Sequence, residues 1–321
     1  MRRTIALTAV LLFAASAFAS EDVIKKGFTV ADGGTLRLDG ALGNIRIVTG
    51  GSGVAFEVTR KADGRRAEKT MANHKITFEQ RGNDVVVVSD VDEWRGGSWF
   101  SWDDRYNVQW NIRVPDRYNV DVETSGGWIK IDDIAGTVDA NTSGGSIETG
   151  KISGEGTLNT SGGSITIAGA SARLLAHTSG GNITVGDTTG PVEVKTSGGS
   201  ISLSHTGGEV VAHTSGGNIE VEDAMGRVDA HTSGGSIHAR ISRQPAAESK
   251  LETSGGSVIV SLGPSVAVDL DAEASGGGVR TDVPVTVIGT QDEDSVRGKI
   301  NGGGPKLVLR TSGGGIRVKS M

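Results

Sequence analysis

Cysteine is absent from the 321 residues, and proline is scarce, with 6 residues. Without cysteine an exported chain has no disulfides to brace it and no site for a cysteine-linked lipid anchor. Low proline combined with abundant valine and isoleucine argues against a disordered linker. Stability must therefore come from side-chain packing and backbone pairing.

Long apolar runs are also lacking, apart from one at the start of the chain. Residues 1–19 read MRRTIALTAVLLFAASAFA, with two arginines, an apolar core and the small-residue site Ala17-Phe18-Ala19. This pattern predicts a secretory signal peptide. Its core is too short for a membrane span, and no other stretch reaches the roughly 20 apolar residues that a spanning helix needs. We expect an exported, soluble protein that is periplasmic, secreted or at the cell surface.

The sequence also has no excess of positive charge. The formal net charge is −6, and it falls to −8 when Arg2 and Arg3 are removed with the leader. A negative chain is poorly suited to bind nucleic acid or an anionic membrane surface. We predict neither as a partner.

Glycine is the residue present in excess, at 50 of 321 positions, roughly twice its usual share of about 7%. The glycines recur in the motif Thr-Ser-Gly-Gly, which repeats every 18 residues through most of the chain. A strict period of this kind indicates a repeat architecture. The motif begins at residues 124, 142, 160, 178, 196, 214, 232, 253 and 311, and its variant Ala-Ser-Gly-Gly begins at residue 274.

Each unit divides into two halves that follow one template. The unit at residues 196–213 reads TSGGSISLS and then HTGGEVVAH. In both halves a glycine marks a turn, and apolar residues at positions six and eight alternate as in a strand with one buried face. Stacked coils bury the apolar row that a single coil leaves exposed. We predict an all-β fold, a parallel β-solenoid with 18-residue coils and two short strands per coil.

The Thr-Ser-Gly-Gly motif is interpreted as the corner of each coil. Counting by twos from the buried positions places Thr142, Thr160 and Thr178 inside, where stacked threonines are expected to hydrogen-bond in a ladder. The Ser-Gly-Gly that follows is expected to supply positive φ angles and to let successive corners approach closely. The motif lacks the lysine and the following helix of a phosphate loop, and it lacks the aspartate of calcium-binding nonapeptides. It therefore predicts architecture.

Less regular segments flank the repeats. The half-unit template already fits GALGNIRIV at residues 40–48, whereas residues 62–118 depart from it and include the hairpin pattern HKITFEQRGNDVVVVSD. We expect these strands to cap the solenoid. We expect residues 283–310 to form an edge loop or cap, and the last motif to close the chain. The predicted organisation is a signal peptide at 1–19, an N-terminal β region and cap with a Trp-rich loop at 20–122, and β-solenoid repeats with a C-terminal cap at 123–321.

Aromatic residues make up only 4% of the chain, yet six of them crowd into residues 94–110. Tryptophans interspersed with glycine, serine and aspartate can stack on sugars or bind a protein surface. The alternative is that they pack the cap against the first coil, and for Trp110 we expect this burial. The predicted binding residues are Trp94, Trp99, Phe100, Trp102 and Tyr106.

Histidines and acidic residues form two further sets. His177, His213 and His231 share one position in their coils, but Lys195 interrupts the column and no third supporting ligand is present. No Ser-His-Asp set can be assembled from the spacing, and other residue types interrupt the acidic column. We predict no catalytic residues, no metal and no cofactor. The acidic residues considered are Asp132, Asp133, Asp187, Glu222 and Asp223.

The sequence NIRVPDRYNVDVETSGGWIKI at residues 111–131, followed by repeated TSGGSI units, resembles a bacterial family of exported proteins. The family is described as "putative adhesins", or as β-strand-repeat domains of unknown function. The resemblance covers most of residues 28–319. It implies a cell-envelope β-solenoid with an adhesive role, and it supplies no catalytic residues.

The expected function is therefore that of a non-enzymatic exported β-solenoid, an adhesin or a cell-envelope binding or structural protein. Its expected partner is an envelope glycan or a surface protein. The alternative is a polysaccharide-active β-helix enzyme, a lyase or a hydrolase, and glycoside hydrolysis requires two carboxylates at a fixed separation. A third possibility is a structural rod that assembles end to end.

Overall fold

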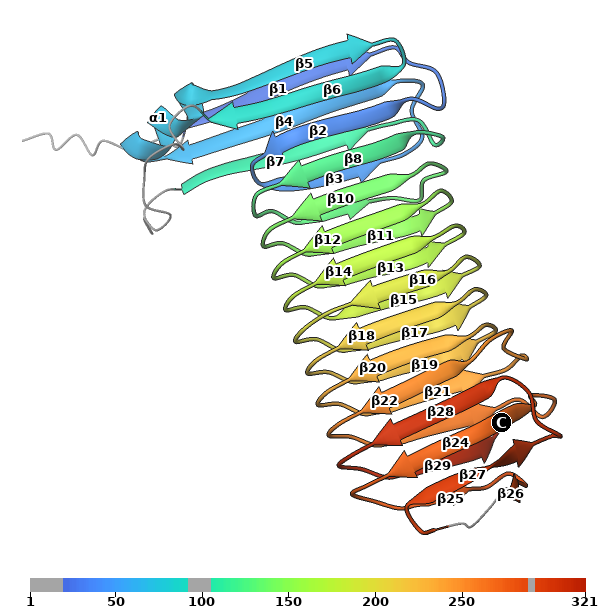
Figure 1. Cartoon of the computed structure of the whole chain (residues 1–321). Helices are drawn as coiled ribbons and strands as arrows, with labels where there is room; N and C mark the ends of the chain where they lie inside the picture. The colour runs from blue at the N-terminus through green and yellow to red at the C-terminus, as the bar shows by residue number, and fades with distance from the viewer. Residues whose placement is uncertain (1–19, 92–104, 288–291) are drawn as a thin grey trace, which may run out of the picture.

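The computed structural model describes residues 20–91, 105–287 and 292–321, and it shows a long rod built from two β-sheets (Figure 1). Among these residues sheet A has 14 strands and sheet B has 15. Sheet A runs β1-β4-β7-β3-β9-β11-β13-β15-β17-β19-β21-β23-β29-β25. Sheet B runs β26-β27-β24-β28-β22-β20-β18-β16-β14-β12-β10-β8-β2-β6-β5. The predicted β-solenoid is confirmed.

In the middle of the rod each coil contributes one strand to each sheet and stacks in parallel on the coil before it. Ile147 pairs with Ile165 and Ile165 with Ile183, so equivalent residues lie in register. The strands are β8 Asn119–Thr124, β9 Ile129–Ile131, β10 Val138–Thr142, β11 Ile147–Ile152, β12 Gly156–Thr160, β13 Ile165–Ala170, β14 Leu174–Thr178, β15 Ile183–Thr188, β16 Val192–Lys195, β17 Ile201–Thr206, β18 Val210–Thr214, β19 Ile219–Ala224, β20 Val228–Thr232, β21 Ile237–Ile241, β22 Ser249–Thr253 and β23 Val258–Leu262.

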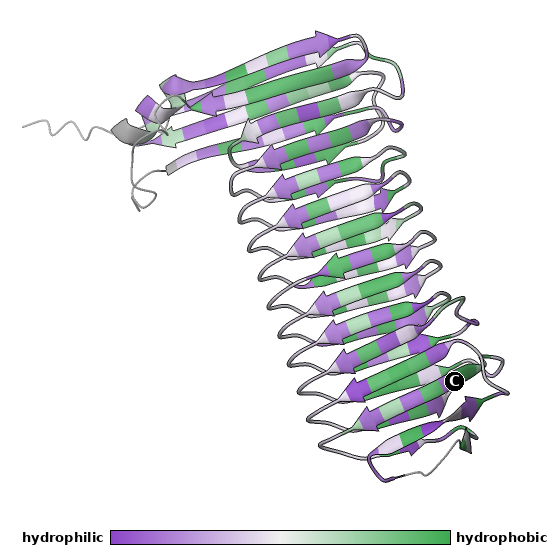
Figure 2. Ribbon diagram, viewed as in Figure 1, coloured by the Kyte–Doolittle hydropathy of each residue, from purple (hydrophilic) through white to green (hydrophobic). Residues whose placement is uncertain are grey.

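The core lies between the two sheets. Along β13, Ile165 and Ile167 are buried while Thr166 is exposed, and the other strands alternate in the same way. Figure 2 shows this as hydrophobic and hydrophilic residues interleaved along the strands. Successive side chains of a strand point to opposite faces, so the apolar row of every coil enters one continuous core.

The corner threonines are buried, as predicted, but they do not bond to one another. The Thr160 hydroxyl donates to the carbonyl oxygen of Gly145 in the preceding coil at 2.7 Å, and it accepts the N–H of Gly163 at 3.4 Å. The expectation of a threonine-to-threonine ladder was therefore wrong. The tight turn leaves a backbone carbonyl and an N–H near each hydroxyl, and these satisfy it first.

The second glycine of the corner is needed for space. A Cβ built on Gly163 would lie 2.1 Å from the carbonyl oxygen of Gly145, whereas one on Gly162 would meet its nearest atom at 3.4 Å. Neither glycine is among the described residues with positive φ. The predicted close approach of successive corners is confirmed, and the predicted positive φ angles were wrong, because the corner turns with ordinary dihedral angles.

At the N-terminal end the order of the coils departs from the order of the chain. β2 (Thr35–Ala41) and β3 (Asn44–Val48) form a coil that stacks on β8 and β9. On its other side it pairs in parallel with β6 (Asp84–Val91) and β7 (Arg105–Arg113). The coil that comes first in the chain therefore lies between strands that come later.

Antiparallel strands complete this end. β4 (Val54–Asp63) pairs with β7, β1 (Ser20–Phe28) with β4, and β5 (His74–Arg81) with β6, so the predicted hairpin at 74–90 is confirmed. Helix α1 (Arg65–Asn73), which the sequence analysis did not predict, links β4 to β5. Among the described residues no helix has the length and apolarity to cross a membrane.

Aromatic rings close the core at the same end. Phe56 stands edge-on to Phe28 and Phe78, with ring centroids 6.0 and 5.1 Å away. These rings come from β4, β1 and β5 and so connect the two sheets. Trp110 is fully buried, as predicted, and its indole N–H donates to the carbonyl oxygen of Leu42 at 3.0 Å.

At the C-terminal end the last motif lies inside the stack. β28 (Lys306–Thr311) pairs with both β22 and β24 (Val268–Ala274), and β29 (Ile316–Ser320) pairs with both β23 and β25 (Val279–Thr281). The last motif therefore ends the chain but does not form the end of the rod. β24 and β25 form the outer coil, and β27 (Ser295–Ile300) and β26 (Thr286–Val287) extend sheet B beyond it in antiparallel fashion.

Candidate functional site

The predicted aromatic binding residues fall mostly outside the described part of the chain. Trp94, Trp99, Phe100 and Trp102 lie in residues 92–104 and remain a prediction. Tyr106 lies on β7, partly buried, with its hydroxyl 2.6 Å from Nδ1 of His74. Burial raises the pKa of Tyr106 to about 12, so the hydroxyl stays protonated at neutral pH.

His74 and Tyr106 belong to a polar cluster that connects the two sheets beside helix α1. His74 is 4% exposed, and its Nε2 lies 2.7 Å from the Ser89 hydroxyl. Arg60 donates to the His74 carbonyl oxygen at 3.0 Å and forms an ion pair with Asp22. Burial, reinforced by the nearby Arg60 charge, lowers the pKa of His74 to about 4. These groups satisfy one another, so the cluster stabilises the end of the rod.

A column of short polar side chains runs beside the Thr-Ser-Gly-Gly corner, at the fifth position of each unit. Ser146 accepts the backbone N–H of Ser164 at 3.2 Å, and Ser164 accepts that of Asn182 at 3.2 Å. The first motif has Trp128 at this position. The backbone N–H of Trp128 donates to the Asn44 side-chain oxygen at 3.1 Å. Trp128 is 37% exposed. A large aromatic residue thus replaces a serine or asparagine in a column that begins at Asn44 in the neighbouring coil.

Trp128 stands beside a groove of about 560 Å³ on sheet A. The glycine corners Gly126, Gly144 and Gly145 line this groove and add no side chains that would fill it. Lys130 and Glu148, which form an ion pair, line it on the strand side. An indole ring next to an open groove with charged and polar groups is an arrangement that can stack an apolar sugar face and hydrogen-bond its hydroxyls.

A second groove, of about 700 Å³, opens beside the first. Its lining includes Lys25 from β1, Arg46 from β3 and Arg113 from β7. Arg46 is the register partner of Lys130, so the two grooves meet at the boundary between β3 and β9. Together they form one surface on the outer face of sheet A, which we call the Trp128 surface.

The sequence pattern of one protein family, Toastrack DUF4097, matches residues 43–319. The chain belongs to the Toastrack family. This match includes the Trp128 motif, every Thr-Ser-Gly-Gly corner and the coil that is inserted at the C-terminal end, and it agrees with the resemblance seen in the sequence. No curated protein matches the chain.

Several solved structures match this Toastrack protein over most of its length at low identity. A "putative cell adhesion protein" from Clostridium sporogenes is 13% identical, with a TM-score of 0.23 over 95% of this chain and 100% of that one. A "putative adhesin" from Bacteroides fragilis is 11% identical, with a TM-score of 0.32 over 94% and 98%. A "putative lipid binding protein" from Parabacteroides distasonis is 13% identical, with a TM-score of 0.38 over 93% and 97%. Scores of this size carry no functional argument.

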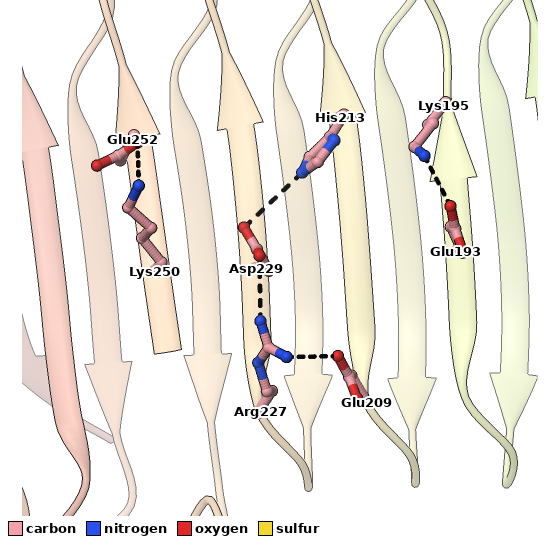
Figure 3. Close-up of polar contacts among 8 residues, drawn as sticks. All are labelled: Glu193, Lys195, Glu209, His213, Arg227, Asp229, Lys250 and Glu252. Carbon is pink, nitrogen blue, oxygen red and sulfur yellow. Dashed lines mark hydrogen bonds and ion pairs between the residues drawn. The ribbon is translucent and has the colours of Figure 1, made fainter. Parts of the chain in front are cut away.

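The outer face of sheet B in the Toastrack rod carries several ion pairs along its middle and later coils (Figure 3). Arg227 bridges Glu209 at 2.7 Å and Asp229 at 3.1 Å, which joins neighbouring coils. Lys195 pairs with Glu193 at 2.7 Å and lowers the pKa of that carboxyl. Exposed pairs of this kind contribute only about 0–1 kcal/mol each. Because these charges already pair with one another, this face is a weaker binding candidate than the Trp128 surface.

The histidine column lies on the same face. Lys195 separates His177 from His213 in the register, as the sequence indicated, and the rings of His213 and His231 lie 6.1 Å apart, edge to face. Within residues 20–91, 105–287 and 292–321, no three His, Asp or Glu side chains converge on a possible metal position.

Three of the five acidic residues near the other corner have separate partners. Asp132 accepts from Arg46 at 3.0 Å, and Asp187 lies 2.9 Å from Nδ1 of His205. Asp133 accepts the backbone N–H of Lys151 at 2.8 Å. Each of these carboxylates therefore has a local structural role.

The sequence analysis missed Trp128, although the sequence contains the signal. Position five of the motif is serine or asparagine in the coils that begin at residues 142 to 253 and tryptophan in the coil that begins at 124. The departure from the repeat marks the residue, because a position that the architecture fills with a small polar side chain has no architectural need for an indole.

Proposed function

We propose that this Toastrack protein is a non-enzymatic, exported adhesin-type protein that binds a glycan of the cell envelope or of a cell surface beside Trp128. The observation that carries the proposal is the exposed indole ring at the edge of a glycine-lined groove. The predicted signal peptide supports export, although residues 1–19 lie outside the described part of the chain.

The rod favours an extended ligand. Strands in a sheet are about 4.8 Å apart, so a polymer lying across them meets equivalent side chains at regular intervals. Trp128 would provide the one large contact, because an aromatic ring offers much apolar area and loses few rotatable bonds on binding. Hydrogen bonds hold the backbone at Trp128, whose N–H donates to Asn44 Oδ1 at 3.1 Å and whose carbonyl oxygen accepts the N–H of Ile45 at 2.9 Å.

The variant Trp128→Ser tests the proposal. It recreates TSGGSI, the sequence of the coil that follows, so the melting temperature should change by no more than about 2 °C. Binding on a glycan array and by titration should weaken about tenfold or more, which corresponds to about 1.4 kcal/mol. The matched variant Trp128→Phe keeps an aromatic ring and should retain most of the affinity.

Two results would redirect the proposal. If Trp128→Ser binds as tightly as the unaltered protein while the double variant Trp99→Ala, Trp102→Ala does not bind, the site is the predicted aromatic segment instead. If an envelope polysaccharide is shortened on incubation, and a carboxylate variant such as Glu148→Gln stops this, the enzyme alternative is correct.

A further inference from the structure

The outermost strands of the two ends differ in length. In the part of the chain that the structure describes, the sheets finish at the C-terminal end in β25 and β26, which have 3 and 2 residues. At the N-terminal end they finish in β1 and β5, with 9 and 8 residues (Figure 1). An edge strand presents unpaired N–H and C=O groups to which another chain can add, and a very short edge offers little of this template. The N-terminal end has no such protection from length.

Lys26, on the outermost strand of sheet A, points toward the inside of the rod. It is the register partner of Phe56, which is 3% exposed and belongs to the core. Directly opposed residues of an antiparallel pair lie on the same face of the sheet. The neighbours of Lys26 on this face, Ile24 and Phe28, pack against the core, yet Lys26 itself is exposed. Its ammonium group therefore reaches water at the open edge of the core.

Lys26 carries its charge without an ion-pair partner. Lys25, on the outer face of the same strand, pairs with Glu57 at 2.7 Å, whereas within residues 20–91, 105–287 and 292–321 no carboxylate pairs with Lys26. The carboxylate on the inner face of β1 is that of Asp22, and it already accepts from Nε of Arg60 at 3.1 Å. Water is therefore the main source of solvation for the Lys26 charge.

Without Lys26, β1 would be a suitable edge for another strand. Ile24 and Phe28 offer apolar area on its inner face, and Val23 is 44% exposed on the outer face. A second copy of the chain brings an identical edge, so the two β1 strands can pair about a twofold axis and make sheet A continuous between two rods. The added strand would cover Lys26, and removing an unpaired ammonium group from water is costly.

We propose that the N-terminal edge of the rod is a docking surface for a second copy of this chain, and that Lys26 keeps this surface closed. An inward-pointing charge on an edge strand prevents pairing because the strand cannot be extended without burying the charge. The rods therefore stay separate at this end, which opposes the alternative of a rod that assembles end to end. This inference concerns self-association and stands apart from the proposed glycan-binding function.

The variant Lys26→Val of the mature chain, residues 20–321, tests the proposal. Light scattering and sedimentation should give the mass of one chain for the unaltered protein and twice that mass for the variant, with a self-association constant at least about tenfold tighter. Amide hydrogen exchange should show new protection in residues 20–28 of the dimer. Lys25→Val is the matched control, because it removes the same charge from the neighbouring residue on the outer face, and it should remain a single chain.

Two further variants separate the inward charge from other effects. Lys26→Glu keeps a charge on the inner face and should remain a single chain. Lys26→Met removes the charge but keeps an unbranched stem, so it should form the dimer even if the valine variant is poorly folded. Because Lys26 is exposed, the melting temperatures of these variants should not fall below that of the unaltered protein.

Three results would overturn the proposal. The first is that both Lys26→Val and Lys26→Met remain single chains. The second is that Lys25→Val associates as strongly as Lys26→Val, because loss of charge on either face would then be enough. The third is that the unaltered protein is already a dimer which Lys26→Val and Asp22→Asn each dissociate. Lys26 would in that case pair with Asp22 of the second copy and would hold the edge together.

Discussion

The middle of the rod and its two ends are built by different rules. Between β8 and β23 each coil stacks on the coil that precedes it in the chain, whereas at both ends one coil is inserted between two others (Figure 1). At the N-terminal end the inserted coil is made of β2 and β3, which come before their neighbours β6 to β9. At the C-terminal end it is β28 and β29, which come last.

The difference affects how the two ends can form. The N-terminal inserted coil is already present when its later neighbours arrive, so they can add to it in turn. The C-terminal outer coil of β24 and β25 gains its parallel partners, β28 and β29, only after the end of the chain arrives. Long-range contacts of this kind close late and lose more chain entropy than local ones. The C-terminal end should therefore depend on the last residues much more than the middle depends on any one coil.

Removing residues 304–321 should have the largest effect. The deletion takes away the buried side chains Leu307, Leu309, Ile316 and Val318, each of which contributes about 1.5–3 kcal/mol. It also leaves β25 without the strand that it pairs with, and it leaves β24 paired with β27 alone. We expect amide hydrogen exchange to show loss of protection in residues 263–300, while the coils from β8 to β21 stay protected.

A synthetic peptide of residues 304–321 provides the control. Added to the shortened protein, it should bind and restore protection to residues 263–300, because both neighbouring coils are still present to pair with it. A peptide with Leu309→Asp should not. If the shortened protein is as protected as the full chain, β24 and β25 have paired directly with β22 and β23, and the inserted coil is dispensable.

Within the middle of the rod, the second corner glycine should be far less replaceable than the first. Gly163→Ala places a methyl group 2.1 Å from the Gly145 carbonyl oxygen, and this backbone atom cannot move without opening the stack. We expect a loss of more than about 3 kcal/mol. Gly162→Ala meets nothing closer than 3.4 Å and should change the free energy of unfolding by less than about 1 kcal/mol. Urea denaturation of the two variants measures this, and equal losses would show that space at the corner is not the constraint.

Much of the middle of the rod could be predicted because the residues that determine its structure lie within a single repeat. The 18-residue period, the alternation of Ile165 and Ile167, and the buried threonines follow from spacing within one unit. The order of the end coils does not. β28 has the same inward pattern as β22, with Leu309 and Thr311 paired to Leu251 and Thr253, so the sequence of a coil does not specify which neighbour it stacks on. Helix α1 was missed because its nine residues, RRAEKTMAN, include few apolar ones.

The candidate site could be predicted only in part. Trp128 can be found as a departure from the column of serine and asparagine, but the basic part of the surface cannot. Arg46 and Lys130 are 84 positions apart in the chain and become neighbours because β3 is inserted next to β9. Spacing within a repeat does not contain this information, so the site needs the fold of the N-terminal end.

The smallest predicted effect is a pH dependence of folding stability that arises at the N-terminal end of the rod and not in its middle. His74 has a folded-state pKa of about 4, below its ordinary value of 6.5. As pH falls from 6.5 to 4 the unfolded chain takes up the proton first, so folding stability is lost over this range and is fully present above it. The loss should be about 2–3 kcal/mol, and the variant His74→Gln should lack it.

The test measures the free energy of unfolding of both proteins at pH 7 and pH 4. Taking the difference between the two proteins cancels the contribution of the other titrating groups. An identical dependence in His74→Gln would mean that the buried cluster does not control stability at this end.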